Sequence, residues 1–191
     1  MKNLLFISII TFFLQSCGPF IGTVGMVSLG AAAKEKGLAT SINDNLIKTK
    51  ISNLIFKLDK NLISNTRIFV NNGSVLITGK VKNPNDKIEF TKLAWTVRGV
   101  NEVNNEIQIT DTSLIKNVAR DVASMGEIRA RIMQDKGINS LNYSIDVVND
   151  KAYLSGVASS KEEMLLVKNH ASSARFVKEV YNYIILNDDI R

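Results

Sequence analysis

The chain has 191 residues, of which 45% are apolar and two are proline, so its composition excludes general disorder. Its single cysteine excludes an intrachain disulfide, and its stability must therefore come from packed cores. The formal net charge of +6 is spread along the chain without a Lys/Arg tract, which suits contact with anionic head groups or acidic polymers but identifies neither.

The first 17 residues have the features of an export signal. Lys2 supplies a positive charge, and residues 4–13 (LLFISIITFF) form an apolar run too short to span a bilayer of about 30 Å as a helix. Residues 14–17 (LQSC) follow and resemble the lipobox of bacterial lipoproteins. This resemblance implies cleavage after residue 16 and a covalent lipid on Cys17. The alternatives are an ordinary signal peptide with a cysteine near its cleavage site, or a buried free cysteine.

The segment after Cys17 indicates a membrane tether. Each buried CH₂ contributes about 0.8 kcal/mol and one acyl chain binds only reversibly, so two or three chains would give stable anchoring. The next residue is Gly18, not the Asp that retains enterobacterial lipoproteins at the inner membrane; the resemblance therefore implies the periplasmic face of the outer membrane. Residues 18–33 carry no charge and several glycines, which favours a flexible spacer over a membrane-embedded segment. We expect a signal peptide at residues 1–16 and the lipidated cysteine with its apolar, Gly-rich tether at residues 17–40.

An internal repeat organises the rest of the chain. Gly79 and Gly156 lie in two similar segments, VLITGKV and AYLSGVA, that are 77 positions apart. At this offset, without a gap, identical residues recur at many other positions, among them Ile51 and Ile128, Ile55 and Ile132, Ile68 and Ile145, Val70 and Val147, and Asn105 and Asn182. The sequence therefore predicts two copies of one module, at residues 41–110 and 111–187.

The first copy predicts the element order αββαβ. Ser41 followed by Asp44 resembles a capping box, and apolar residues recur at helical spacing from residue 47 to 58. Residues 67–81 predict a β-hairpin that turns at Asn-Asn-Gly. Asn83 and Pro84 then predict the start of a second helix, and residues 102–109 alternate as a closing strand.

The second copy repeats this order, with helices at about residues 113–136 and 160–175, a hairpin turning at residues 149–150 and a strand at residues 179–186. The predicted fold class is α+β: each module is a small three-stranded mixed sheet with two helices. The glycines expected at turns or caps are Gly73, Gly79, Gly99 and Gly156.

The strand–Gly–helix pattern at Gly79 and the residues that open the third strand, RGVNEVNN at 98–105, resemble the BON domain. The second copy shows FVKEVYN at residues 176–182 in the equivalent place. The lipobox, the short spacer and the two modules together resemble the dual-BON-domain lipoproteins of Gram-negative envelopes. In those lipoproteins the second BON module is the one associated with anionic phospholipid.

Catalytic motifs are missing from the sequence. It contains no P-loop, dinucleotide fingerprint, His-Glu-x-x-His motif or cysteine pair. His170 is the only histidine and is expected to be packed or partly buried on its helix, while Asp146 and Asp150 are expected in solvated or capping positions. We therefore expect no enzyme, no metal site, no small-molecule substrate and no cofactor besides the lipid on Cys17. The aromatic residues are not interleaved with Lys/Arg, so we also expect no nucleic-acid partner.

The first helix of the second module is the candidate membrane surface. With Ile128 at 0° and about 100° per residue, its apolar arc extends to about 140° and includes Arg129. An apolar arc with arginines in and beside it is typical of a helix lying in an anionic head-group layer. The alternative is that the apolar residues fill the core while Arg129 snorkels at its edge. The candidate phospholipid-binding residues are Arg120, Val122, Met125, Arg129, Arg131 and Met133.

We therefore expect a non-enzymatic outer-membrane lipoprotein that binds anionic phospholipid through its second BON module and supports envelope integrity. One alternative is a periplasmic scaffold that binds an envelope assembly or secretion complex without lipid specificity. Another is an osmotic-stress periplasmic factor that is never lipidated. Trp95 is expected at the edge of the first core, and a contact with a protein partner is the alternative for this residue.

Overall fold

The computed structural model describes residues 38–110 and 115–187, so the expectations for Cys17, the signal peptide and the tether lie outside the described residues. Within the described part, no helix has both the length and the hydropathy needed to cross a membrane. The first module contains α3 (Leu38–Leu58), α4 (Lys60–Ser64), β1 (Thr66–Asn71), β2 (Ser74–Val81), α5 (Pro84–Trp95), β3 (Glu102–Asn105) and β4 (Gln108–Ile109). The second contains α6 (Ile115–Gln134), the 3₁₀ turn η1 (Ser140–Asn142), β5 (Tyr143–Val148), β6 (Lys151–Ala158), α7 (Lys161–Ser172) and β7 (Glu179–Leu186).

The α+β class and the αββαβ order are confirmed in both modules. In each one an antiparallel hairpin, β1–β2 or β5–β6, is extended by a parallel strand, β3 or β7, on the far side of the hairpin's second strand. The first module adds the short helix α4 and divides its closing strand into β3 and β4, both of which pair with β2. Asn83 caps α5 as predicted, because its side chain accepts the N–H of Asn85 and Pro84 follows it.

Each sheet carries its helices on one face only. Strand alternation directs Val75 and Ile77 of β2 toward the helices, where they are buried with Phe90 of α5. In the second module Leu154 is buried in the same way with Val167 of α7. Each module therefore has its own core of mainly aliphatic side chains between one sheet face and two main helices.

A buried aspartate in the first helix of each module holds the hairpin turn. The carboxylate of Asp44 accepts the N–H groups of Asn72 and Gly73 at 2.9 and 3.1 Å. Asp121 accepts the two equivalent turn N–H groups of the second module, both at 3.0 Å. The capping box expected at Ser41 and Asp44 is therefore wrong, since α3 already begins at Leu38 and Asp44 serves a turn 28 residues along the chain.

Two of the glycines allow close backbone approach. Gly79 has φ of 125°, and a Cβ there would collide with the carbonyl oxygen of Asn65. Gly156 meets the equivalent obstacle, the carbonyl oxygen of Asn142. The repeated glycine therefore lets the second strand of each module pass close to the backbone that precedes its first strand.

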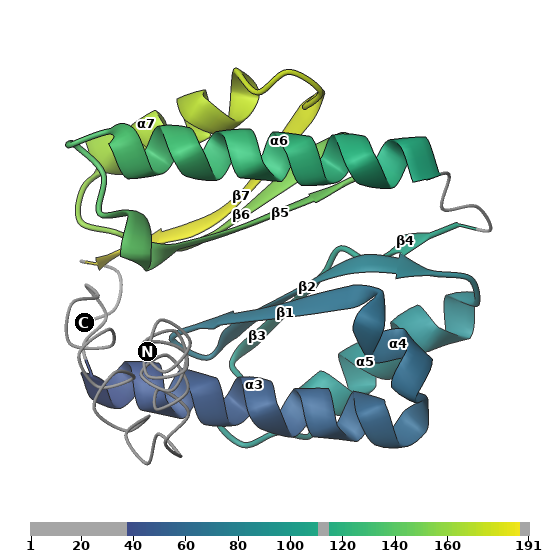
Figure 1. The fold of residues 1–191 in the computed structure, drawn as a ribbon. Coiled ribbons are helices and arrows are strands. Elements are labelled where there is room, and N and C mark those ends of the chain that lie inside the picture. The colour runs from purple at the N-terminus through teal and green to yellow at the C-terminus, as the bar shows by residue number, and fades with distance from the viewer. Residues whose placement is uncertain (1–37, 111–114, 188–191) are drawn as a thin grey trace, which may run out of the picture.

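The two modules pack through the sheet faces that lack helices, which gives four layers in the order helices, sheet, sheet, helices (Figure 1). β1 approaches β6, and β2 approaches β5. Leu76, Val148 and Tyr153 are buried at the centre of this contact, and Tyr153 stacks on Tyr181 with ring centroids 5.2 Å apart. The residues partly buried around them are Phe69, Tyr181 and Tyr183.

Polar bonds between the modules surround this apolar centre. Asp146 of β5 is 3% exposed; it accepts the Thr78 hydroxyl at 2.5 Å and pairs with Arg67 Nε at 2.9 Å. Asn71 donates to Ser155 at 2.6 Å. The expectation of a solvated or capping role for Asp146 is wrong, because strand alternation directs this side chain into the contact between the sheets.

Burial raises the pKa of the Asp146 carboxyl above its ordinary value, against the opposing effects of the Thr78 hydrogen bond and the Arg67 charge. As the pH falls, the Asp146 carboxylate of the native state therefore binds a proton at a higher pH than the same group in the unfolded chain. This preferential proton binding stabilises the native state relative to the unfolded chain. We predict that the unfolding free energy of the wild type, minus that of Asp146→Asn, increases between about pH 7.5 and about pH 4.5 in urea titrations. A difference that decreases over this range would mean that the Arg67 charge outweighs burial.

Candidate functional site

The candidate membrane helix α6 packs one face on the second core. Ile128 and Ile132 are 0% and 1% exposed, and Met125 packs against the same core. Two other candidate side chains lie outside it, since Val122 is 55% and Met133 74% exposed. The structure therefore divides the predicted apolar arc into a buried part and an exposed part.

The three candidate arginines have different surroundings. Arg120 pairs with Asp150 at 3.0 Å, and its guanidinium lies 4.9 Å from the ring centroid of Phe176. Arg131 pairs with Glu127, one helical turn earlier, at 2.6 Å. Arg129 is exposed and donates to the carbonyl oxygen of Ile145 at 3.3 Å, and it forms no ion pair with the described residues. Within the described part of the chain, Arg129 is therefore the candidate arginine whose charge is not paired with a carboxylate.

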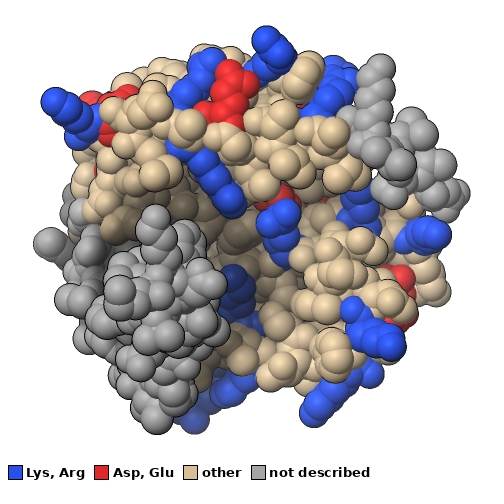
Figure 2. Space-filling model, in the orientation of Figure 1, with Lys and Arg blue, Asp and Glu red and all other residues tan. Residues whose placement is uncertain are grey.

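A groove of about 750 Å³ lies between α6 and the first module. Its wall on α6 is formed by Val118, Asp121, Val122 and Met125, and Asp146 to Val148 of β5 lie beside them. The opposite wall comes from α4, the start of β1 and the end of β2; its residues include Asn61, Ser64, Asn65, Arg67, Lys80 and Lys82. Figure 2 shows the molecule hollowed along the seam between the modules, with Lys and Arg side chains at its edges.

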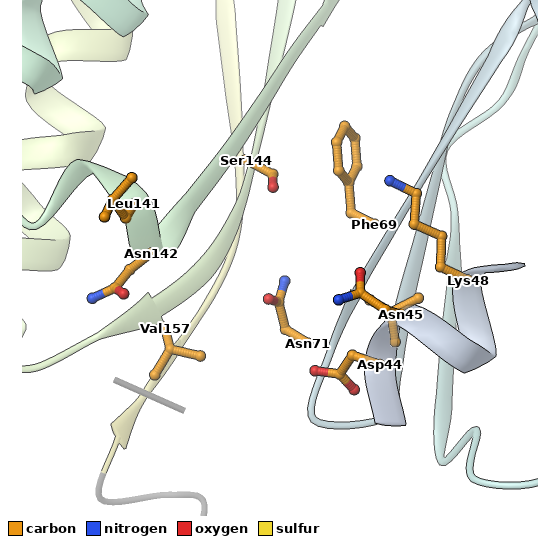
Figure 3. A pocket seen from close by; sticks show the side chains of 10 residues that line it. Asp44, Asn45, Lys48, Phe69, Asn71, Leu141, Asn142, Ser144 and Val157 are labelled. Atoms are coloured by element: carbon orange, nitrogen blue, oxygen red, sulfur yellow. The ribbon is translucent and has the colours of Figure 1, made fainter. Parts of the chain in front are cut away.

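A second, smaller cavity of about 100 Å³ lies elsewhere along the same seam (Figure 3). Asn45 and Lys48 of α3 and Asn71 of β1 line one side of it. Leu141, Asn142 and Ser144 of the second module line the other. Sequence reasoning missed both spaces, because each one is formed by residues of two modules whose relative placement the repeat does not reveal.

The described residues show little that resembles a catalytic site. His170 is partly buried, as expected, and its Nε2 lies 2.7 Å from Asp135 Oδ2. This hydrogen bond is the main reason that the pKa of Asp135 is below its ordinary value. In residues 38–110 and 115–187, no three His, Cys, Asp or Glu side chains come together as metal ligands would.

Exposed apolar side chains also occur on the first module. Trp95, expected at the edge of the core, is 53% exposed at the end of α5, and Ile88 on the same helix is also 53% exposed. These residues are seven apart and therefore lie on one side of α5. This surface fits a protein contact, and α3 of the same module also exposes the large apolar side chains of Leu46, Phe56 and Leu58.

Three known proteins match most of this chain in sequence. The chain is 36% identical over 146 residues to an uncharacterized protein in the gshII 5′ region of Anaplasma centrale, with 76% of this chain and 95% of that protein covered. It is 25% identical over 178 residues to the outer membrane lipoprotein DolP of Haemophilus influenzae, with 91% of this chain and 92% of that protein covered. It is 26% identical over 145 residues to the osmotically-inducible protein Y of Escherichia coli, with 74% of this chain and 71% of that protein covered.

The family model of the BON domain matches the chain twice, at residues 43–111 and 125–188. Each match falls on one copy of the αββαβ fold, with its own sheet and core; the first begins inside α3 and the second inside α6. The chain therefore belongs to the BON-domain family and carries two BON domains in tandem.

Proposed function

We propose that this protein is a non-enzymatic lipoprotein of the bacterial outer membrane, facing the periplasm, that binds anionic phospholipid through α6 of its second BON domain and supports envelope integrity. Similarity to an outer membrane lipoprotein along 91% of the chain supports the location. The LQSC segment at residues 14–17 supports a lipid on Cys17.

The observation that carries the lipid proposal is the exposed side of α6. Met133, 74% exposed, lies one helical turn after Arg129, and Val122 continues the same stripe toward the groove. Burial of such side chains in a head-group layer gains about 25 cal/mol per Å² of apolar surface removed from water. A guanidinium has five N–H donors, so Arg129 keeps donors for a lipid phosphate beside its bond to Ile145.

The other candidate residues contribute less directly. Arg131 would approach phosphate while paired with Glu127, and Arg120 is held by Asp150 and Phe176. Met125 packs on the core and lines the groove, so little of it reaches a membrane surface. The proposed lipid contact is therefore centred on Arg129 and Met133.

The lipid on Cys17 and the surface of α6 would bind the same membrane. Once the acyl chains are inserted, contact by α6 is an intramolecular event, so even a weak lipid affinity becomes effective. This arrangement keeps the second BON domain on the membrane surface and leaves Trp95 and Ile88 of the first domain available for other contacts.

We predict that residues 34–191 sediment with vesicles rich in phosphatidylglycerol or cardiolipin and not with neutral phosphatidylcholine vesicles. Arg129→Glu with Arg131→Glu should weaken this partition about tenfold or more, because each arginine near an anionic surface contributes about 1 kcal/mol. Moderate salt should also weaken it, since the Debye length is about 8 Å at physiological ionic strength.

The matched control is Lys161→Glu with Lys168→Glu, which makes the same change in charge on exposed positions of α7. This control should retain most of the binding. Equal losses in the two double variants would show that only net charge matters, and equal sedimentation with neutral vesicles would contradict lipid selectivity.

For the anchor, we predict that Cys17→Ser abolishes incorporation of labelled palmitate in a Gram-negative host. It should also move the protein out of the outer-membrane fraction, because α6 alone has no acyl chain to hold it there. Normal membrane fractionation of Cys17→Ser would contradict the proposed anchor and favour a factor that is never lipidated.

The second candidate function is a periplasmic scaffold that binds an envelope complex without lipid specificity. The exposed Trp95 and Ile88 of α5 favour it, since large apolar side chains in water often mark protein interfaces. Under this function the vesicle assay shows no anionic preference in either the wild type or the double variants.

A further inference from the structure

The two BON domains are related by an approximate two-fold arrangement. β1 approaches β6 and β2 approaches β5, so an exchange of equivalent strands reproduces the same neighbours. Glu106 and Tyr183 are equivalent residues of the repeat, and they contact each other, with the Tyr183 hydroxyl donating to Glu106 at 2.6 Å. A recess that α3 of the first domain forms against the second domain is therefore expected to have an equivalent, formed by α6 of the second domain against the first.

The two spaces along the seam are such counterparts. Each of the 10 residues that line the small cavity has its equivalent, 77 positions away, in the lining of the 750 Å³ groove. The pairs are Asp44 and Asp121, Asn45 and Val122, Lys48 and Met125, Phe69 and Asp146, Val70 and Val147, Asn71 and Val148, Leu141 and Ser64, Asn142 and Asn65, Ser144 and Arg67, and Val157 and Lys80. The fold therefore builds the same recess twice, once against α3 and once against α6.

The two recesses have diverged in chemistry. On the helix wall, Asn45 and Lys48 of the small cavity are replaced in the groove by Val122 and Met125, and Val118 extends this apolar wall by one turn (Figure 3 shows the cavity). Val118 is 44% and Val122 55% exposed, so the groove keeps apolar surface in contact with water. At three other positions the change is the opposite, since Phe69, Leu141 and Val157 of the small cavity correspond to Asp146, Ser64 and Lys80 of the groove. The groove therefore gathers its exposed apolar side chains on the helix wall.

The opposite wall of the groove is mostly polar, although Leu62 and Val81 also belong to it. It carries Asn61, Ser64, Asn65 and Asn83, and the polar groups of these side chains that are not already bonded need hydrogen-bond partners when covered. An acyl chain would bury these groups without partners at a cost, whereas a polypeptide supplies donors and acceptors along its length. A ligand with one apolar and one polar side therefore fits the groove better than a lipid chain does.

The charges of the groove favour an uncharged occupant. Lys80 pairs with Asp121 and Arg67 with Asp146, so these charges are already compensated within the protein. The groove's other charged side chains are Lys82, Asp59 and Asp86. Three cations and four carboxylates line it in total, and this balance does not attract a strongly charged ligand.

We propose that the groove is a docking site for an amphipathic segment of a partner protein, with apolar side chains toward α6 and uncharged polar side chains toward the first BON domain. Val118, Val122 and Met125 follow the i, i+4, i+7 spacing of one helix face, which suits helix-in-groove recognition. The volume of about 750 Å³ lies within the usual range of binding clefts. The groove shares Val122 and Met125 with the candidate lipid-binding residues, but it does not include Arg129 and Met133, on which the proposed lipid contact is centred.

The test measures fluorescence anisotropy of a labelled peptide of about 15 residues, about 22 Å long as a helix. The peptide carries Leu at i, i+4, i+7 and i+11 with Ser, Asn and Gln elsewhere, and a scrambled peptide of the same composition is the comparison. The protein is the chain from Gly18, which retains both BON domains and every contact between them. We expect the patterned peptide to bind and the scrambled one to bind at least about tenfold more weakly.

Three variants place the site on the groove. Val122→Glu should weaken the patterned peptide about tenfold or more, because a carboxylate would be buried against its apolar side. Asn45→Glu, the same change at the equivalent position of the small cavity, should leave the affinity unchanged. The variant Val122→Asn gives α6 the residue that α3 carries at the equivalent position, and this position is 55% exposed, so the variant should fold with an unchanged melting temperature and bind the patterned peptide more weakly.

Four results would overturn the proposal. These are undetectable binding of the patterned peptide, equal binding of both peptides, equal effects of Val122→Glu and Asn45→Glu, and displacement of the peptide by a single-chain lipid, which would identify an acyl chain as the occupant. Peptide binding by Arg129→Glu with Arg131→Glu separates the two ideas, because neither arginine lines the groove: the inference predicts an unchanged peptide affinity in a variant that the proposed function expects to lose vesicle binding.

Discussion

The structure depends on one constraint: each BON sheet has helices on only one face, so its other face must be covered by something else. That face carries Leu76 in the first domain and Tyr153 in the second, which are 2% and 1% exposed in the packed protein. Separation of the domains would return these side chains to water at about 25 cal/mol per Å². The same separation would break the bonds of Asp146 with Thr78 and Arg67. Packing of one copy on the other satisfies both requirements.

This packing determines what each helix can do. With the sheets in contact, all the main helices lie on the outside, and α6 borders both solvent and the seam (Figure 1). Its exposed side carries Arg129 and Met133, and its seam side carries Val118 and Met125. A single helix therefore presents two surfaces of different chemistry, one suited to an anionic membrane and one to an amphipathic peptide. At the positions equivalent to Val122 and Met125, α3 carries Asn45 and Lys48, so the two helices differ in chemistry on their seam sides.

Much of the fold could be predicted because its determinants are local or periodic. The fixed offset identified both copies, helical spacing identified core residues such as Ile51 and Ile128, and Asn83 with Pro84 marked the start of α5. The sequence did not reveal the bonds of Asp44 and Asp121 to their hairpin turns, because these partners lie 28 or 29 residues away. Asp146 was misread for a related reason: its neighbours Arg67 and Thr78 belong to the other domain. A helical wheel placed Arg120 and Arg131 on a flank of α6 but gave no sign of their carboxylate partners.

The central claim is that the exposed side of α6 is where this protein meets an anionic membrane. Hydrogen–deuterium exchange of the chain from Gly18, with and without phosphatidylglycerol vesicles, tests it most directly, because the measurement locates the contact along the chain. The account predicts slower exchange in α6 around residues 129–134 and unchanged exchange in α3 and α5. Protection confined to α3 or α5, or no protection at all in the presence of bound vesicles, would contradict it.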